Sequence, residues 1–156
     1  MRHAIRESWA VTSKTVSRAK SDLSKADYER LAQFRYLLRK FLIFSQTAAI
    51  KAGLTAQQHQ ALLAIKGVTG RDGMTTGELA ERLGIRHHSA VGLLDRLSAR
   101  GLIRRRAGSE DRRQVLIDLT PKAARILATL SLAHRAELER LAPLLRVLLL
   151  HFRRGS

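Results

Sequence analysis

Residues 75–97 constrain the fold more than any other segment, because they read as two helices joined by a tight turn. Thr75 followed three residues later by Glu78 is a capping box, which marks a helix start. Gly84 predicts the end of that helix, since glycine adopts a left-handed C-cap at low cost. A second helix is predicted over residues 87–100. Apolar residues stand where a helix-turn-helix packs inward: Leu79, Leu83, Ile85, Ala90 and Leu93. An ordinary helical hairpin in an all-helical core is the alternative.

Two short apolar alternations follow directly and predict a β-hairpin, with strands over residues 102–106 and 114–119. Arginines crowd around its turn: Arg104, Arg105, Arg106, Arg112 and Arg113. Like charges this close repel one another, so they indicate a partner that supplies negative charge. A hairpin after a helix-turn-helix makes the winged version of the motif. A merely solvated charged turn is the alternative.

Further helices are predicted before this motif. Apolar residues at three- and four-residue steps predict a long helix over residues 27–51. Thr55 with Gln58 forms a second capping box, which opens a helix that runs to about residue 66. The inward stripe of the long helix is predicted to hold Tyr28, Leu31, Leu38, Phe41, and Phe44 or Ser45.

After the hairpin, Thr120 and Pro121 mark the start of a last long helix, as an N-cap followed by proline at the first helical position. That helix is predicted to reach about residue 141, where Pro143 ends or kinks it before a short helix over residues 144–152. The sequence therefore predicts a mainly α fold (α+β) with a small β-hairpin wing. It is one compact winged helix-turn-helix domain with helical arms at both ends.

The net charge of the 156 residues is +16, with a sequence pI of about 11.6. Such an excess favours nucleic acid or an anionic membrane as the partner, rather than a merely soluble, arginine-rich protein. No apolar run reaches the roughly 18 residues of a membrane-spanning helix. Residues 1–24 are basic and are interpreted as a mobile N-terminal arm, with a transit peptide as the alternative.

The absence of cysteine excludes disulfides, thiolate metal sites and cysteine nucleophiles. We find no nucleophile–base pair, phosphate loop or paired carboxylates, so no catalytic residue, enzyme activity or cofactor is predicted. Adjacent His87 and His88 point about 100° apart on a helix, so they chelate one ion poorly and no metal site is predicted.

The helix predicted over residues 87–100 has two different faces. Its apolar stripe is Ala90, Val91, Leu94 and Leu97. The opposite face is polar and holds His88, Ser89, Gly92, Arg96 and Arg100. Donors on one face and a positive N-terminal dipole suit the major groove of DNA. Gly92 costs about 1 kcal/mol relative to alanine inside a helix. It therefore has either a packing or functional reason, or is simply tolerated.

The turn of the hairpin reads Asp111-Arg112-Arg113. Arginines on a narrow projection can enter a minor groove, where the negative potential is enhanced. Asp111 would be repelled by DNA, so we expect it to orient a neighbouring arginine within the loop.

The chain resembles the MarR family of winged-helix transcriptional regulators over about residues 31–130. The resemblance rests on L-T-A-Q-Q-H-Q-A-L-L-A-I, T-T-G-E-L-A-E-R-L-G-I, L-L-D-R-L-S-A-R-G-L-I-R-R and D-R-R-Q-V-L-I-D-L-T-P-K-A. Its most specific mark is D-x-R followed by L-T six residues later. The sequence departs from the family pattern at Arg86, often Ser or Thr, and at Gly92, often polar or charged.

The resemblance implies a homodimer, whose subunits interlock through residues 25–54 and 121–154, while residues 55–120 bind DNA. It implies that His87, His88, Ser89, Gly92 and Arg96 face the major groove. Arg113, with Arg112 beside it, would reach the minor groove, and Asp95 would pair with Arg113 and set the angle of the wing.

Many relatives are repressors released by a small aromatic or phenolic effector. A cleft for it in this chain would involve Phe34, Leu37, Leu38 and Phe41, which are also core candidates.

The favoured hypothesis is a sequence-specific, dimeric regulator that binds an inverted repeat in double-stranded DNA, without a membrane partner. It would be cytoplasmic and associated with the bacterial nucleoid. The alternative is a non-specific basic nucleic-acid-binding protein, architectural or RNA-binding, with steep salt dependence and little sequence preference.

Overall fold

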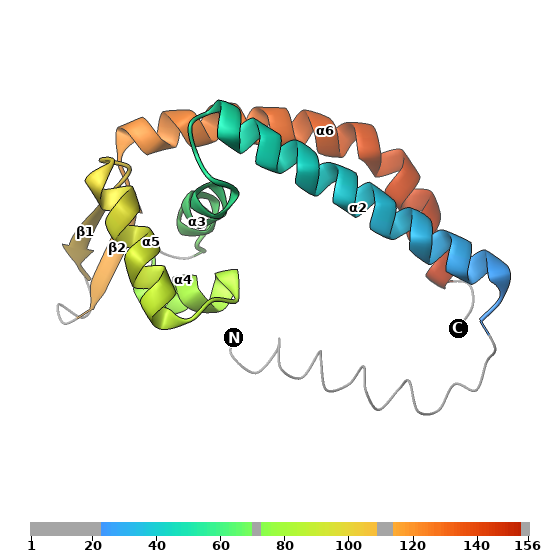
Figure 1. Ribbon diagram of the computed structural model, residues 1–156, viewed down its shortest axis with the longest axis horizontal. Coiled ribbons are helices and arrows are strands. Elements are labelled where there is room, and N and C mark those ends of the chain that lie inside the picture. Colours follow the sequence, from blue (N-terminus) through green and yellow to red (C-terminus); the bar gives the residue numbers. More distant parts are fainter. Residues whose placement is uncertain (1–22, 70–72, 109–113, 154–156) are drawn as a thin grey trace. The chain divides into compact units, whose positions relative to one another are not determined.

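The computed structural model describes residues 23–69, 73–108 and 114–153. Its elements are helices α2 (Lys25–Lys51), α3 (Ala56–Lys66), α4 (Thr76–Leu83) and α5 (His87–Ala99), strands β1 (Ile103–Ala107) and β2 (Val115–Leu119), and helix α6 (Pro121–Arg153) (Figure 1). The chain divides into two units, residues 1–36 and 37–156, which we describe separately. A mainly helical fold with one hairpin confirms the predicted fold class.

The capping boxes form as predicted and start two of the helices. At α3, the Thr55 hydroxyl accepts the Gln58 amide at 3.1 Å, and the Gln58 side chain accepts the Thr55 amide at 3.1 Å. At α4, the Thr75 hydroxyl accepts the Glu78 amide at 3.3 Å, and the Glu78 carboxylate accepts the Thr75 amide at 2.9 Å. Gly84 ends α4 with φ of 62°, the left-handed conformation that the sequence indicated.

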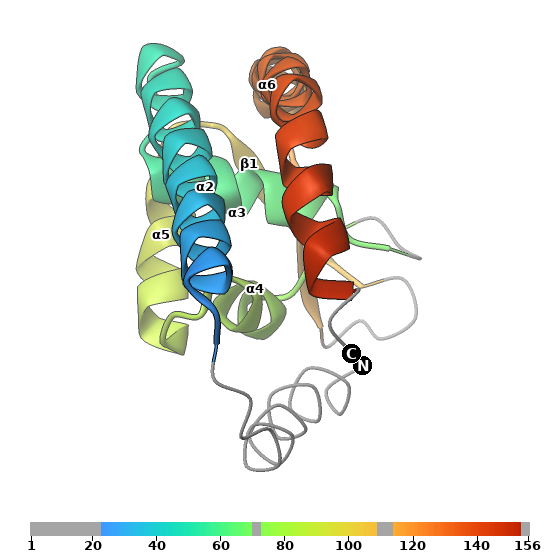
Figure 2. The same cartoon turned by 90° about the vertical axis from the view of Figure 1, so that its right-hand side faces the viewer.

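The two strands pair antiparallel, with Arg105 opposite Ile117 and Arg104 opposite Asp118. Met74, just before α4, forms a bridge to Ile117 on β2, with N–O distances of 3.1 and 2.9 Å between their backbones. This bridge ties the start of the helix-turn-helix to the hairpin. Figure 2 shows α4 beside α5, and α4 also packs against α3.

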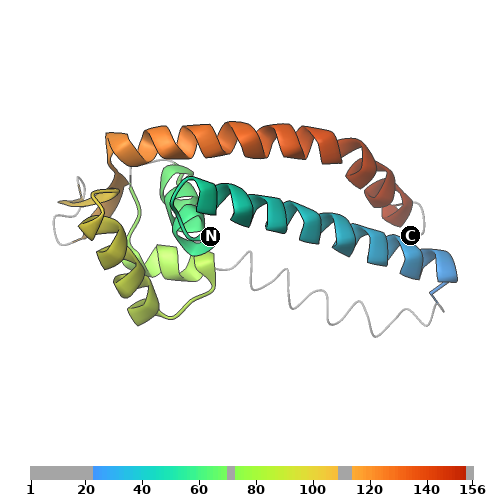
Figure 3. The ribbon, with the colours of Figure 1, turned by 45° about the horizontal axis from the view of Figure 1, so that its top comes forward.

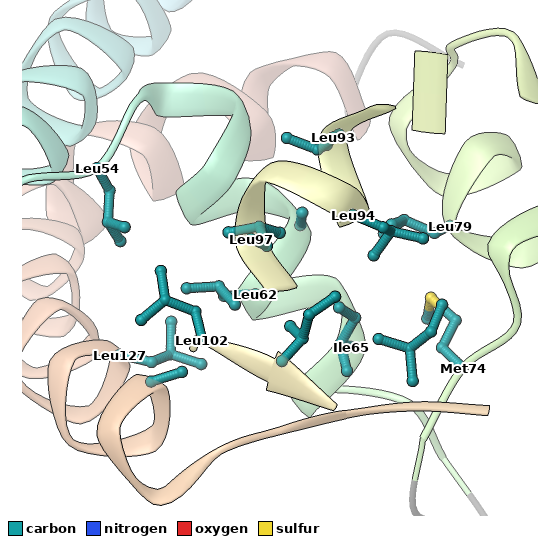
Figure 4. Packing of buried hydrophobic residues seen from close by; sticks show 14 of the residues in the cluster. Leu54, Leu62, Ile65, Met74, Leu79, Leu93, Leu94, Leu97, Leu102 and Leu127 are labelled. Atoms are coloured by element: carbon teal, nitrogen blue, oxygen red, sulfur yellow. The ribbon is translucent and has the colours of Figure 1, made fainter. Parts of the chain in front are cut away.

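One hydrophobic core lies between α3, α4, α5, the hairpin and the start of α6 (Figure 4). Among its largest fully buried side chains are Leu62, Leu94 and Leu97. Truncating a buried leucine to alanine lowers the free energy of unfolding by about 2–5 kcal/mol, so these side chains fix α4, α5 and the hairpin against one another.

The predicted apolar stripe of α5 is wrong at one position. Val91 is 37% exposed, and Leu93 is buried at 1%. The core meets α5 from both α4 and the hairpin, so the buried face includes Leu93, as the helix-turn-helix pattern predicted, and leaves out Val91.

The predicted inward stripe of α2 is also only partly correct. In the first unit, Tyr28 is 60% and Leu31 is 41% exposed. In the second unit, Leu37 is buried and Leu38 is 42% exposed. Phe41 is half-buried. A single chain therefore leaves part of this stripe in water, which the periodicity alone cannot reveal.

Helix α6 continues through Pro143 to Arg153, so the expected separate short helix after the proline is wrong. Figure 3 shows α6 bending towards its C-terminal end. Proline removes one backbone hydrogen bond, which bends a helix without ending it where the flanking turns hold. None of the helices in the described part of the chain is long and apolar enough to cross a membrane.

Candidate nucleic-acid interface

The residues predicted to face the major groove of DNA all lie on α5. His87, His88, Ser89 and Arg96 are exposed, and Gly92 is half-buried. Arg86 is the N-cap of α5 and makes no side-chain capping bond, and the first turn holds no acidic residue. The positive end of the helix dipole is therefore not countered locally, which suits a phosphate or base edge.

Packing does not explain the glycine at position 92. A Cβ atom there would meet only the end of the Arg96 side chain, at 3.4 Å from Nη1. That guanidinium is flexible and can move away, so alanine would fit sterically. The structure therefore gives no packing reason for Gly92, which leaves a functional reason or simple tolerance.

Arg100 does not belong to the DNA-facing set in which the sequence placed it. Its Nη1 donates to Gln58 Oε1 at 2.9 Å, and its Nη2 donates to the carbonyl of Gly53 at 2.8 Å. It ties the end of α5 to the turn between α2 and α3. Helical periodicity gives the angular position of Arg100, but the neighbouring turn decides where its long side chain goes.

The wing joins α5 through an ion pair that the sequence did not predict. Arg105 of β1 and Asp95 of α5 lie 2.6 Å apart, with side chains 43% and 56% exposed. Asp95 was expected to pair with Arg113. Asp111, Arg112 and Arg113 lie outside the described residues, so their roles stay predictions.

The sequence reasoning also missed Asp118, the acid on the opposite face of the hairpin. Its side chain is 11% exposed, and Oδ2 lies 2.6 Å from Arg106 Nε and 3.8 Å from Arg104 Nε. Alternation along β1 therefore sends Arg105 towards α5 and its two neighbours towards Asp118. The signal was present, since an acid within an apolar strand faces an arginine-rich strand once the register is known.

Two histidines meet at the junction of α2, α3 and α6. The rings of His59 and His134 are 4.8 Å apart, and Phe41 and Phe44 contact His134 edge-on. His134 Nδ1 donates to the Leu130 carbonyl at 2.6 Å, and Nε2 lies 2.8 Å from the Ser45 hydroxyl. Periodicity within single helices does not predict this contact, because the two histidines lie on different helices.

The pKa of His59 is lowered, first by burial and then by the charge of His134. In the unfolded chain His59 has its ordinary pKa of about 6.5, so it takes up a proton at a higher pH than it does in the folded protein. Stability is therefore lost as the pH falls through about 6.5. We expect the free energy of unfolding to fall by at most about 1.4 kcal/mol per pH unit from this residue.

Urea unfolding at about pH 7.5 and pH 5.5, at one protein concentration, checks this. The loss of unfolding free energy between these two pH values should be smaller in His59→Phe than in the unsubstituted protein. It should be unchanged in the control His88→Gln, whose side chain is exposed. An unchanged decrease in His59→Phe would remove His59 as its source.

No group of three or more His, Cys, Asp or Glu residues that could hold a metal ion occurs within the described ranges. Of the residues predicted for the effector cleft, Leu37 is buried at 4% and Leu38 is 42% exposed. Phe34 belongs to the first unit. The cleft stays a prediction.

Comparison with known proteins agrees with the motifs. Residues 52–114 match the model of the MarR family, which covers α3 to the wing turn. This segment is similar to the MarR family and folds as a winged helix. The resemblance inferred from the sequence motifs is thereby confirmed for this segment.

The chain is similar to the transcriptional activatory protein BadR of Rhodopseudomonas palustris, with 31% identity over 114 residues. The match covers 72% of this chain and 63% of BadR, so the chain spans less than two thirds of that relative.

Solved structures share the fold. CouR of Rhodococcus jostii RHA1, bound to p-coumaroyl-CoA, has a TM-score of 0.62 and 24% identity, covering 75% of this chain and 81% of CouR. A variant of MepR from Staphylococcus aureus, bound to an oligodeoxyribonucleotide, has a TM-score of 0.59 and 18% identity, covering 78% and 84%.

Proposed function

We propose that this protein is a sequence-specific, DNA-binding transcriptional regulator that acts as a homodimer. The observation that carries the proposal is the exposed polar face of α5 within a MarR-family winged helix, joined by Asp95 to the arginine-rich wing. Helix α5 would enter the major groove, with His88, Ser89 and Arg96 at the base edges. Arg113 would reach the adjacent minor groove.

Apolar side chains left in water support the homodimer. On α6, Leu144 is 50%, Leu149 is 51% and Leu150 is 47% exposed, and Leu42 on α2 is 58% exposed. Large exposed apolar surface marks an interaction site, and MarR-type arms come from these two helices. A two-fold dimer would present two copies of α5 and so favour an inverted repeat.

The direction of regulation and the effector are finer proposals. We propose repression relieved by a small aromatic or phenolic acid. CouR, a relative in fold, was solved with a CoA ester of such an acid. BadR, by contrast, is named as an activator. We also propose a cytoplasmic, nucleoid-associated location and no catalytic activity or cofactor.

Selection of bound duplexes from a random DNA pool tests the main proposal, at about 0.15 M salt so that purely electrostatic binding is weakened. Enrichment of an inverted repeat is expected. Tight binding at low salt without any enriched sequence would instead identify a non-specific basic binding protein, the alternative that is also consistent with the charge of +16.

Asp95 offers a sharper test of how the wing is held. Its exposed ion pair contributes at most about 1 kcal/mol to folding. Replacing Asp95 by Asn removes negative charge, which by itself favours DNA binding. We nevertheless expect Asp95→Asn to bind the selected repeat about fivefold to tenfold more weakly, because Arg105 and the wing lose their anchor.

The matched control is Glu81→Gln, which removes an exposed acid from α4. Its affinity in fluorescence anisotropy should stay the same or rise slightly. A rise for Asp95→Asn as well would show that Asp95 acts only as a repelling charge.

A further inference from the structure

A cavity of about 490 Å³ lies behind the wing, on the side of the hairpin opposite the Arg105–Asp95 pair. It is formed by the end of α3, the hairpin and the start of α6. Its volume is within the range of small-molecule sites. Its polar lining comprises Lys66, Arg104, Arg106, Asp118 and Thr120.

Arg106 and Asp118 form the fixed part of this site. They lie 2.6 Å apart, and the Asp118 side chain is 11% exposed. Gly73, with φ of +99°, lies directly against this carboxylate: a Cβ atom there would be only 2.5 Å from Asp118 Oδ1. The backbone and Arg106 therefore cover and neutralise Asp118, the only acid among the lining residues that the structure describes.

Among the described lining residues, two positive charges remain in excess once this pair is set aside, on Lys66 at the end of α3 and Arg104 on β1. The Arg104 side chain is 66% exposed and lies 3.8 Å from Asp118, so it holds that acid only loosely. The N-terminus of α6 opens at the same place, where Thr120 and Pro121 line the cavity and the first turn has no acidic residue. All of these features favour an anion.

The apolar lining residues are Val68, Leu119, Pro121 and Ala124, which are partly or fully exposed, together with the buried Ile65. A bare ion would leave this surface in contact with water. An anion that carries an apolar body would cover it, which gains about 25 cal/mol per Å² of buried apolar area.

We propose that this cavity binds a small organic dianion of the phosphate-monoester type, with Lys66 and Arg104 at its charged head and the apolar wall against its body. The residues that line this cavity do not include any residue of the exposed polar face of α5. The cavity is lined partly by β1, the strand that also carries Arg105. A ligand bound there would therefore contact the base of the wing.

Titration of the ¹⁵N-labelled full-length protein with phenyl phosphate, at about 0.15 M salt and without DNA, tests the site. We expect saturable shifts of the amides of Gly73, Leu119 and Ala124. Inorganic phosphate lacks the apolar body and phenol lacks the charge, so each should bind at least tenfold more weakly.

The double variant Lys66→Gln, Arg104→Gln should weaken phenyl phosphate binding at least tenfold, and Lys66→Gln alone about threefold to tenfold. The matched double control is Lys51→Gln, Arg125→Gln, which removes two exposed positive charges that do not line the cavity. It should change the affinity less than twofold. The single variant Lys66→Gln leaves Arg104 in place, so it tests the site even if the loss of Arg104 disturbs Asp118.

Three results would overturn the proposal: no saturable shifts, equal binding of inorganic phosphate, or equal effects of the two double variants. A fourth would identify a contact with the DNA backbone instead. In that case phenyl phosphate does not bind, while the cavity variants bind DNA more weakly than their control. Because the titration contains no DNA, its failure leaves the proposed regulator function untouched.

Discussion

Deleting residues 143–156 should convert the proposed dimer to a monomer in analytical ultracentrifugation. The deleted part of α6 carries Leu144, Leu149 and Leu150, each about half exposed in the single chain, and an interface would cover them. The winged-helix core should survive, because its buried residues end at Leu130 on this helix. A monomer holds one half-site, so the affinity for the inverted repeat should fall by roughly 10²–10⁴-fold.

A point variant separates the interface from the loss of chain. Leu144→Glu places a charge at a half-exposed position, and we expect it to weaken the dimer while the circular dichroism stays helical. Arg146→Glu, an exposed neighbour on α6, is the matched control and should leave the dimer intact. A truncated chain that still sediments as a dimer would exclude this segment from the interface.

Replacing Arg113 by alanine should weaken binding to the selected repeat by about 1–3 kcal/mol, roughly fivefold to 150-fold. The reason is the loss of an arginine that the MarR resemblance places in the minor groove. The oligomeric state and the thermal unfolding should be unchanged, because a charged arginine is not expected to contribute to a hydrophobic core. Fluorescence anisotropy at about 0.15 M salt measures the affinity.

Arg125→Ala is the control for Arg113→Ala, since it removes the same charge from an exposed position on α6. It should lower the affinity much less and equally for specific and random DNA. If Arg113→Ala behaves like Arg125→Ala, then the turn of the wing contributes only general charge, and specificity rests on α5.

The hairpin places its three consecutive arginines in different surroundings. Arg105 pairs with Asp95 on α5, whereas Arg106 pairs with Asp118 on β2. Two acids thus hold the base of the wing from both faces. In the sequence these arginines form one basic run. Only the strand register shows that they pair with acids on opposite faces of the hairpin.

Local signals were sufficient for much of the fold. The capping boxes at Thr55 and Thr75 and the left-handed turn at Gly84 formed where the sequence indicated. Such features involve residues three or four positions apart, so their hydrogen bonds and backbone conformations are set by near neighbours. The order of these capping and turn signals along the chain predicts the helix-turn-helix and the hairpin. The helical spacing of apolar residues in α5 predicts most of its exposed face.

Contacts between distant residues depended on the tertiary structure. Arg100 reaches Gly53 and Gln58, and His134 meets His59, although dozens of residues separate them in the chain. A long side chain can reach several neighbours, and periodicity gives its direction from the helix axis but not its partner. The same limit explains the exposed stripe on α2: an amphipathic pattern tells which face is apolar, while the packing of the whole chain decides whether that face is covered.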